Sequence, residues 1–273
     1  MSPSQANYYL PIHLRSLIWQ FARREVLAKY RGSLLGLGWS FLTPLLMLLV
    51  YTFVFREVFN ARWPAASGIN ATDSNLSFAL QVYAGMIVFN FFSEVMGRAP
   101  RLILDQPNLV KKVVFPVEVL SWVAVLAAGF HFLVNLAVLL VAILSMSGSL
   151  PVALLALPLV VITFIPLLLG LAWFLASLGV FLRDIGQLIG MILTALMFLS
   201  PIFYPVQAIP EQWRPLLAAN PLTVPIEQFK GIVLEGLWPD WQTLILYLLF
   251  SSAVCWMGAQ WFRVTRKGFA DVI

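Results

Sequence analysis

Long runs of apolar residues, separated by short polar segments, dominate the chain from residue 34 onward. Each run is long enough to cross about 30 Å of hydrocarbon as a helix, which takes about 20 residues. The pattern therefore predicts an all-α membrane protein with six transmembrane helices in a single domain, 34–273. The expected spans are 34–55, 76–97, 118–145, 152–182, 186–205 and 243–262. In the fifth span, Gly186 and Gly190 predict a face for close helix packing.

The N-terminal segment 1–33 is amphipathic instead of uniformly apolar. Its apolar residues recur at i, i+3, i+4 and i+7, as in a helix that lies along a membrane surface. They are Leu14, Leu17, Ile18 and Phe21. We expect a cytoplasmic interface helix here, and the spacing leaves open whether it also docks a cytoplasmic partner. No short apolar core with an A-x-A site follows, so a cleavable signal peptide is not expected.

Two of the segments between the spans are unusually long. Residues 98–116 form a connection punctuated by three prolines, with a short segment around Asp105 to Lys112. Residues 203–242 are moderately apolar but rich in proline and tryptophan, too broken to cross a membrane as one straight helix. Interrupted backbone at membrane depth survives only where protein or a cavity covers it. This segment is therefore expected to form short re-entrant helices in the outer leaflet.

Charge fixes the expected orientation. Of the 17 lysines and arginines, all but Arg56, Arg62, Arg214 and Lys230 fall on the side of the N-terminus. By the positive-inside rule, both termini are expected in the cytoplasm. The net charge of +5 then needs no nucleic-acid partner. Because 61% of residues are hydrophobic and 11% charged, against about 45–50% and 25% in soluble domains, a soluble globule is excluded.

The sequence lacks the common signatures of catalysis. It has no G-x-x-x-x-G-K-[ST] phosphate loop, no H-E-x-x-H and no G-x-S-x-G elbow. Two histidines and one cysteine make an imidazole or thiolate metal site improbable. The outer acidic residues are scattered without a motif, which disfavours a membrane-embedded glycosyltransferase or acyltransferase.

Polar residues within the spans are functional by default. Glu94 has Arg98 one turn further on, which predicts an i,i+4 ion pair at the inner interface. His131, with Asn135 at i+4, is expected to be neutral and hydrogen-bonded within the bundle, because the sequence offers no second intramembrane carboxylate as its partner. An ion-coupled carrier, which needs paired intramembrane charge, is therefore disfavoured.

Four segments resemble the membrane subunits of ABC-2 type transporters, specifically the branch that exports O-antigen, capsular polysaccharide or teichoic acid. They are KYRGSLLGLGWSFLTPLLMLLVYTFVF (29–55), NLVKKVVFPVEVL (108–120), the fifth span with the segment after it, DIGQLIGMILTALMFLSPIFYPVQAIPEQWRPLLAANPLTVPIEQFKGIVLEG (184–236), and KGFADVI (267–273). Together they extend over nearly the whole chain, in the order found in that branch.

The resemblance implies a homodimer of this chain, carrying two copies of a separate cytoplasmic ATPase subunit. That subunit would bind ATP and Mg, and this chain no cofactor. The implied substrate is a lipid-linked polysaccharide, exported across the bacterial inner membrane. A drug or lipid exporter of the same ABC-2 type, with the same fold and partner, is the alternative.

The resemblance also assigns residues to roles. Candidate contacts with the ATPase are Arg23, Arg24, Tyr30, Arg31, Asp105, Asn108, Lys111 and Lys112. Candidate lining of the polymer channel, from spans one and five, comprises Tyr51, Phe55, Phe198 and Tyr204. Ring faces there would stack on the C–H faces of sugars, with core packing as the alternative for each ring. The candidate outer gate comprises Pro201, Pro205, Asn220 and Pro221.

Overall fold

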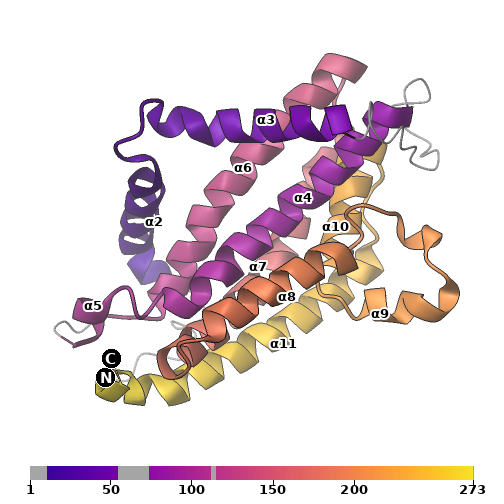
Figure 1. The fold of residues 1–273 in the computed structure, drawn as a ribbon. Helices are drawn as coiled ribbons and strands as arrows, with labels where there is room; N and C mark the ends of the chain where they lie inside the picture. Colours follow the sequence, from indigo (N-terminus) through magenta and orange to yellow (C-terminus); the bar gives the residue numbers. More distant parts are fainter. Residues whose placement is uncertain (1–10, 55–73, 112–114, 273) are drawn as a thin grey trace.

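The computed structural model describes residues 11–54, 74–111 and 115–272. Every regular element in these ranges is helical, so the all-α fold class is confirmed (Figure 1). The α-helices are α2 (Arg15–Tyr30), α3 (Trp39–Phe53), α4 (Ser74–Arg98), α5 (Pro107–Lys111), α6 (Val119–Ser147), α7 (Leu157–Phe181), α8 (Ile185–Leu199), α9 (Arg214–Ala218), α10 (Thr223–Lys230), α11 (Trp241–Thr265) and α12 (Phe269–Val272).

Five helical segments are long and apolar enough to cross a membrane, and they coincide with five of the six expected spans. The fifth expected span, 186–205, is too long. α8 ends at Leu199 because Ser200 is extended (φ −93°, ψ 151°), the conformation that a following proline, here Pro201, favours. Its 15 residues rise about 22 Å, which is less than the thickness of the hydrocarbon layer.

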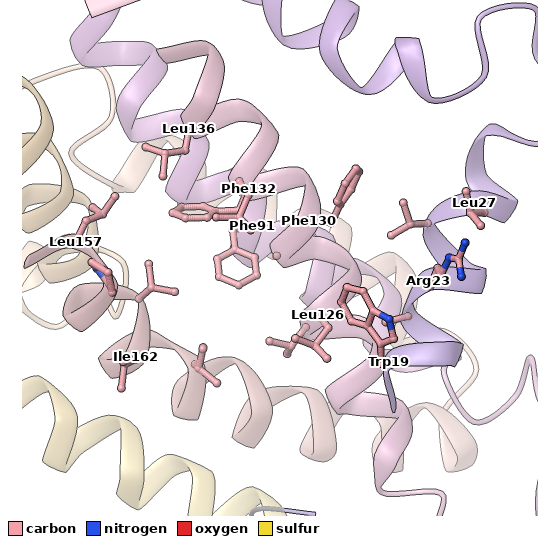
Figure 2. Close-up of a pocket in the computed structure, with 18 of the residues that line it drawn as sticks. Trp19, Arg23, Leu27, Phe91, Leu126, Phe130, Phe132, Leu136, Leu157 and Ile162 are labelled. Atoms are coloured by element: carbon pink, nitrogen blue, oxygen red, sulfur yellow. The ribbon is translucent and has the colours of Figure 1, made fainter. Parts of the chain in front are cut away.

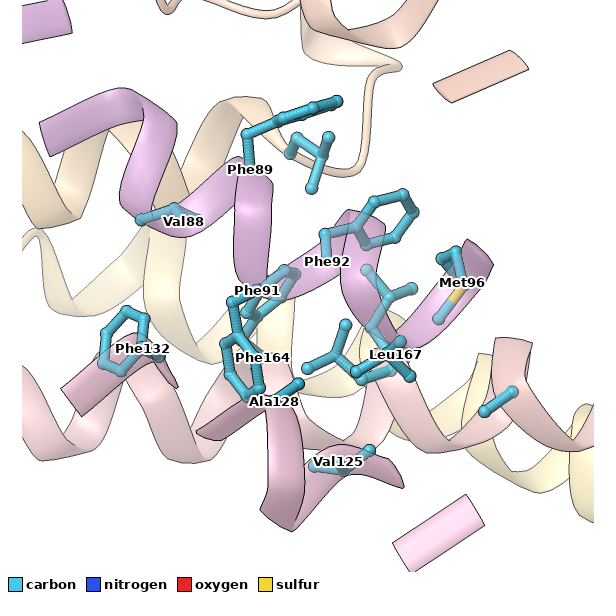
Figure 3. Close-up of a cluster of buried hydrophobic side chains, with 14 of the residues drawn as sticks. Val88, Phe89, Phe91, Phe92, Met96, Val125, Ala128, Phe132, Phe164 and Leu167 are labelled. Atoms are coloured by element: carbon cyan, nitrogen blue, oxygen red, sulfur yellow. The ribbon is translucent and has the colours of Figure 1, made fainter. Parts of the chain in front are cut away.

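The core lies where α4, α6 and α7 meet (Figure 3). Phe91 of α4 packs between two rings, with its centroid 5.2 Å from that of Phe132 on α6 and 5.9 Å from that of Phe164 on α7. Such tilted and edge-to-face contacts are the arrangements that aromatic rings prefer. The aromatic cluster joins the three helices into one packed unit.

Small residues bring α7 and α11 into backbone contact. A Cβ atom added at Gly258 would lie 2.0 Å from the Gly170 carbonyl oxygen, and one at Gly170 would lie 2.5 Å from the Val254 oxygen. By contrast, a Cβ at Gly186 or Gly190 would meet nothing within 4 Å among the described residues. Within one protomer, the close packing expected at α8 therefore occurs between α7 and α11.

Helix α2 lies within the N-terminal segment, and one face of it is buried against α6. Ile18 and Ala22 lie in one cluster with Val119 and Val123. In Figure 1, α2, α5 and the C-terminal α12 occupy the left-hand end of the molecule and α9 and α10 the opposite end. We call these the α2 end and the α10 end.

The membrane-length helices differ greatly in burial. In an 18-residue apolar window of each span, only 11% of the residues are buried in Gly36–Phe53, against 72% in Phe78–Arg101. Helix α8 is similarly open, with Met191 71% and Phe198 59% exposed. One protomer thus leaves large apolar faces of α3 and α8 for lipid or for another chain to cover.

Candidate functional site: the polar clusters at the two ends

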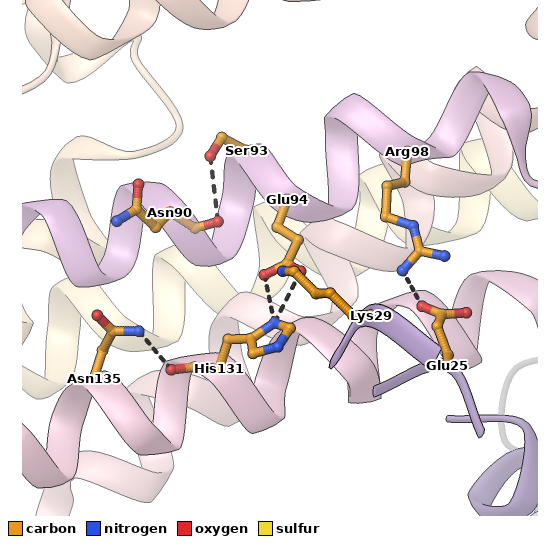
Figure 4. Close-up of polar contacts among 8 residues, drawn as sticks. All are labelled: Glu25, Lys29, Asn90, Ser93, Glu94, Arg98, His131 and Asn135. Atoms are coloured by element: carbon orange, nitrogen blue, oxygen red, sulfur yellow. Dashed lines mark hydrogen bonds and ion pairs between the residues drawn. The ribbon is translucent and has the colours of Figure 1, made fainter. Parts of the chain in front are cut away.

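An ion-pair network fastens α2 to α4 and α6 (Figure 4). The Glu94 carboxylate accepts a hydrogen bond from Lys29 Nζ of α2 at 3.0 Å and lies 2.9 Å from His131 Nδ1 of α6. A second ion pair joins Arg98 of α4 to Glu25 of α2. The expected pair between Glu94 and Arg98 is therefore wrong, because both side chains find opposite charges on other helices.

His131 also differs from its expected surroundings. A carboxylate does pair with it: both oxygens of Glu94 lie 2.9 Å from Nδ1. Asn135 donates to the His131 carbonyl oxygen at 2.7 Å, and Tyr83 donates to Asn135 at 3.3 Å. The buried Nε2 atom has no hydrogen-bond partner in the described part of the chain.

A cavity of about 580 Å³ opens beside this network, between α2, α3, α4 and α6. Its lining combines aromatic rings with polar groups and includes Tyr51, Tyr83, Asn90, Glu94 and His131. The Tyr51 ring, a candidate for channel lining, lies 6.4 Å from the Tyr83 ring. Phe55, the second candidate from this span, lies outside the described residues.

The other two channel candidates lie together at the α10 end. Phe198 stacks on Phe203, with ring centroids 5.9 Å apart, and Tyr204 donates from its hydroxyl to the Phe198 carbonyl oxygen at 2.9 Å. Tyr51 and Tyr204 line different cavities. Of the candidates that the structure describes, Tyr51 therefore lies apart from Phe198 and Tyr204 in one copy of the chain.

The structure connects the candidate gate residues to the end of α8. Asn220 Nδ2 donates to Ser200 Oγ at 3.0 Å and to the Leu199 carbonyl oxygen at 3.2 Å. The Pro221 carbonyl oxygen accepts from the Tyr247 hydroxyl of α11 at 2.8 Å. Pro201 and Pro205 both line a polar cavity beside α10.

Lys230 holds the same helix end, and no pattern in the sequence indicates this. The charge pattern predicts an outer basic residue, yet Lys230 is only 6% exposed. Its Nζ atom donates to the carbonyl oxygens of Pro201 at 2.7 Å and Ile202 at 3.1 Å. Burial lowers the pKa of Lys230 from 10.5 to about 7, because the charged amine loses its hydration.

The candidate ATPase contacts lie at the α2 end. On α2 and just after it, Arg23, Arg24 and Arg31 are exposed. Tyr30 instead lies half-buried, with its ring 6.0 Å from that of His131. Around α5, the exposed candidates are Asp105 and Asn108. Lys112 and the side chain of Lys111 lie outside the described part of the chain.

An apolar groove of about 730 Å³ runs between α2, α6 and α7. Figure 2 shows Trp19, Arg23 and Leu27 at one end of it and Leu157 and Ile162 toward the other. Among the described residues that line it, Arg23 alone is charged. An apolar groove on the side of a bundle of membrane-length helices suits contact with acyl chains.

Five apolar helical segments of membrane-spanning length in the described part of the chain mark a multi-pass integral membrane protein. Residues 16–234 match the family model for ABC-2 type transporters. This chain therefore belongs to the ABC-2 type transporter family.

Three relatives show which members it resembles. The O-antigen export system permease protein RfbA of Myxococcus xanthus is 30% identical, covering 95% of this chain and 96% of the relative. A protein of the same name from Klebsiella pneumoniae is 23% identical, covering 96% of both. The polysialic acid transport protein KpsM of Escherichia coli is 24% identical, covering 89% of this chain and 91% of its own length.

Proposed function

We propose that this chain is the permease subunit of an ATP-driven exporter that moves a lipid-linked polysaccharide across the bacterial inner membrane. The main support comes from relatives that this chain matches over nearly their whole length. Their names refer to two kinds of polymer, O-antigen and polysialic acid. What these two have in common is that they are long chains of sugars. The specific polymer differs between the relatives, but the class does not.

In this proposal, ATP and Mg bind to a separate ATPase subunit at the α2 end. The exposed arginines of α2 and the exposed Asp105 and Asn108 supply charged and polar contacts there. Because ion pairs join Lys29 to Glu94 and Glu25 to Arg98, a displacement of α2 would move α4 and α6 as well. Rigid-body shifts of this kind are an established way to carry motion between sites.

The passage for the polymer would form between two copies of the chain. The exposed faces of α3 and α8 support this, as does the open Gly186 and Gly190 face, which permits a second helix to approach closely. Tyr51, Phe198 and Tyr204 would then present rings to the sugars. The joint between α8 and α10, with Pro201 and Asn220, would act as the outer gate.

Deletion of the gene tests the proposal. A strain without this chain should lose its surface polysaccharide while lipid-linked polymer accumulates in the cytoplasm, and a plasmid copy should restore both. Normal surface polysaccharide in a deletion strain that has no second exporter would refute the proposed function.

The apolar groove beside α2 favours one alternative, an ABC-2 exporter of lipids or drugs, because its lining suits an apolar substrate. The same deletion strain distinguishes the two. Sensitivity to toxic apolar compounds with an unchanged surface glycan would favour the alternative.

A further inference from the structure

A polar cavity of about 340 Å³ opens at the α10 end, where the polymer would leave. Three parts of the chain enclose it: the beginning of α4, the turn after α8, and the stretch from α10 to the start of α11. Its volume falls at the lower end of the range for small-molecule sites, about 300–1,000 Å³. The lining residues that matter here are Gln81, Tyr204, Glu227, Lys230, Glu235 and Trp238.

Gln81 contributes an amide to the cavity wall. This side chain on α4 is only 2% exposed, and it makes no hydrogen bond with any residue in the described part of the chain. Its amide atoms are not among the fully enclosed polar atoms without a partner, which are Trp122 Nε1 and His131 Nε2 in the described residues, so the amide opens into the cavity. A ligand in the cavity can therefore donate to its oxygen and accept from its nitrogen.

The charges of the lining disfavour an anionic ligand. Glu227, Glu235 and Asp240 line the cavity and would repel an anion, and the Lys230 amine on the same wall is already engaged by two carbonyl oxygens. The described residues contain no group of three or more histidine, cysteine or acidic side chains that could hold a metal ion. Carboxylates and amides together accept from and donate to hydroxyl groups.

Two aromatic rings complete the site. Trp238 is 57% exposed at the cavity, and the half-buried Tyr204 is fixed by its hydroxyl, which donates to the Phe198 carbonyl oxygen at 2.9 Å. The exposed indole of Trp238 offers an apolar face and a ring N–H donor to a ligand in the cavity. The C–H face of a sugar ring fits such a surface, while its hydroxyls reach the polar wall.

We propose that this cavity is a saccharide-binding site, which holds a neutral sugar unit of the polymer at the exit of the channel. This proposal rests on the proposed function, because the exported polymer is the source of the sugar. The Lys230 contacts with the carbonyl oxygens of Pro201 and Ile202 join the cavity wall to the end of α8. A sugar held there would keep the emerging chain from slipping back between cycles of ATP hydrolysis.

The test compares variants of the full exporter complex in lipid nanodiscs. The probe is the surface polysaccharide of the same strain, released from its lipid by mild acid, with tryptophan fluorescence as the readout. Gln81→Leu should weaken binding at least tenfold and should not lower the melting temperature, because Gln81 makes no hydrogen bond with the described residues. Trp238→Ala should abolish the fluorescence change.

Matched controls lie nearby. For Trp238→Ala the control is Trp241→Ala: Trp241 is 50% exposed and does not line the cavity, so binding should be unchanged. For Gln81→Leu the control is Gln212→Leu, at an exposed glutamine outside the cavity. In cells, Gln81→Leu and Trp238→Ala should reduce surface polysaccharide about fivefold or more, and the controls less than twofold.

If Gln81→Leu and Trp238→Ala bind and export like the controls while the deletion strain exports nothing, the saccharide site is wrong and the proposed function stands. If the deletion strain exports normally, the function itself fails. Should Gln81→Leu fail to fold, Trp238→Ala decides the matter alone, because the exposed Trp238 ring is not needed for the core.

Discussion

Two pairs of helices differ in how closely they pack: α7 and α11 are in tight contact with each other, whereas α3 and α8 are largely exposed. At Gly170 and Gly258 the backbones of α7 and α11 touch, and Ser177 bonds to Thr265 between the same helices at 2.6 Å. α3 and α8 instead expose most of their apolar side chains. A protein that changes shape during transport needs both a fixed part and surfaces that can shift against another chain.

The difference indicates a division of labour within the protomer. Two helices whose backbones touch cannot slide gradually past each other, because packed interfaces have discrete arrangements. We infer that α7 and α11 serve as the fixed part. In the proposed dimer, the exposed helices would belong to the interface that opens and closes, and the ion pairs of α2 would lie between that interface and the ATPase subunit.

The largest effect is expected where the backbones touch. Gly258→Ala places a Cβ 2.0 Å from the Gly170 carbonyl oxygen, so the helices must separate. The expected loss of stability is about 3 kcal/mol, at the upper end of the usual cost of overpacking. Thermal unfolding of the protein purified in detergent measures it, and a melting temperature equal to that of the wild type would show that the helices are not closely packed.

The next effect concerns the network at the α2 end. Glu94→Gln removes the charge that pairs with Lys29 and His131, so stability should fall by about 2 kcal/mol. Export per ATP hydrolysed should fall as well, because α2 is less firmly joined to the bundle.

The matched control for this network is Glu211→Gln. Glu211 is 89% exposed and lies 3.5 Å from Arg214, so its change should cost less than about 0.5 kcal/mol. Equal effects of Glu94→Gln and Glu211→Gln on stability and export would contradict a coupling role for the network.

A smaller effect, dependent on pH, is expected at the joint between α8 and α10. Because the folded pKa of Lys230 is about 7 and its ordinary value is 10.5, the unfolded chain binds more protons between these values. Stability should therefore rise by about 1 kcal/mol per pH unit above pH 7, relative to Lys230→Met. Melting curves of both proteins between pH 7 and 9 provide the comparison, and parallel pH dependences would show that Lys230 is hydrated.

The smallest effect is expected on α8. Gly190→Ala meets no described atom within 4 Å, and alanine is a better helix former than glycine. The stability of the folded protomer should therefore change by less than about 1 kcal/mol and, if at all, increase. A loss as large as that of Gly258→Ala would mean that α8 packs as tightly as α11.

The sequence predicted the helices well but not their contacts. Apolar runs specify spans because a helix must cover its backbone in lipid, and five of the six were confirmed. The end of α8 was misplaced since an apolar run continues past Pro201, although the helix does not. The re-entrant depth of α9 and α10 remains a prediction.

The polar network was missed because its members lie far apart in the chain. The pairing of Glu94 with Arg98 followed from helical spacing, whereas Lys29 and His131 approach Glu94 only in the folded bundle. Lys230 was missed for a related reason, since no local pattern reveals that a lysine in an outer segment bonds to two carbonyl groups.

Disulfide cross-linking in native membranes tests most directly whether the exposed helices meet a second copy. With Cys255, the single cysteine of the chain, changed to alanine, Gly190→Cys on α8 should form a covalent dimer on oxidation. Val141→Cys, at a site 67% exposed on α6, should remain monomeric. A dimer linked through Val141→Cys and not through Gly190→Cys would contradict the assignment of α8 to the interface.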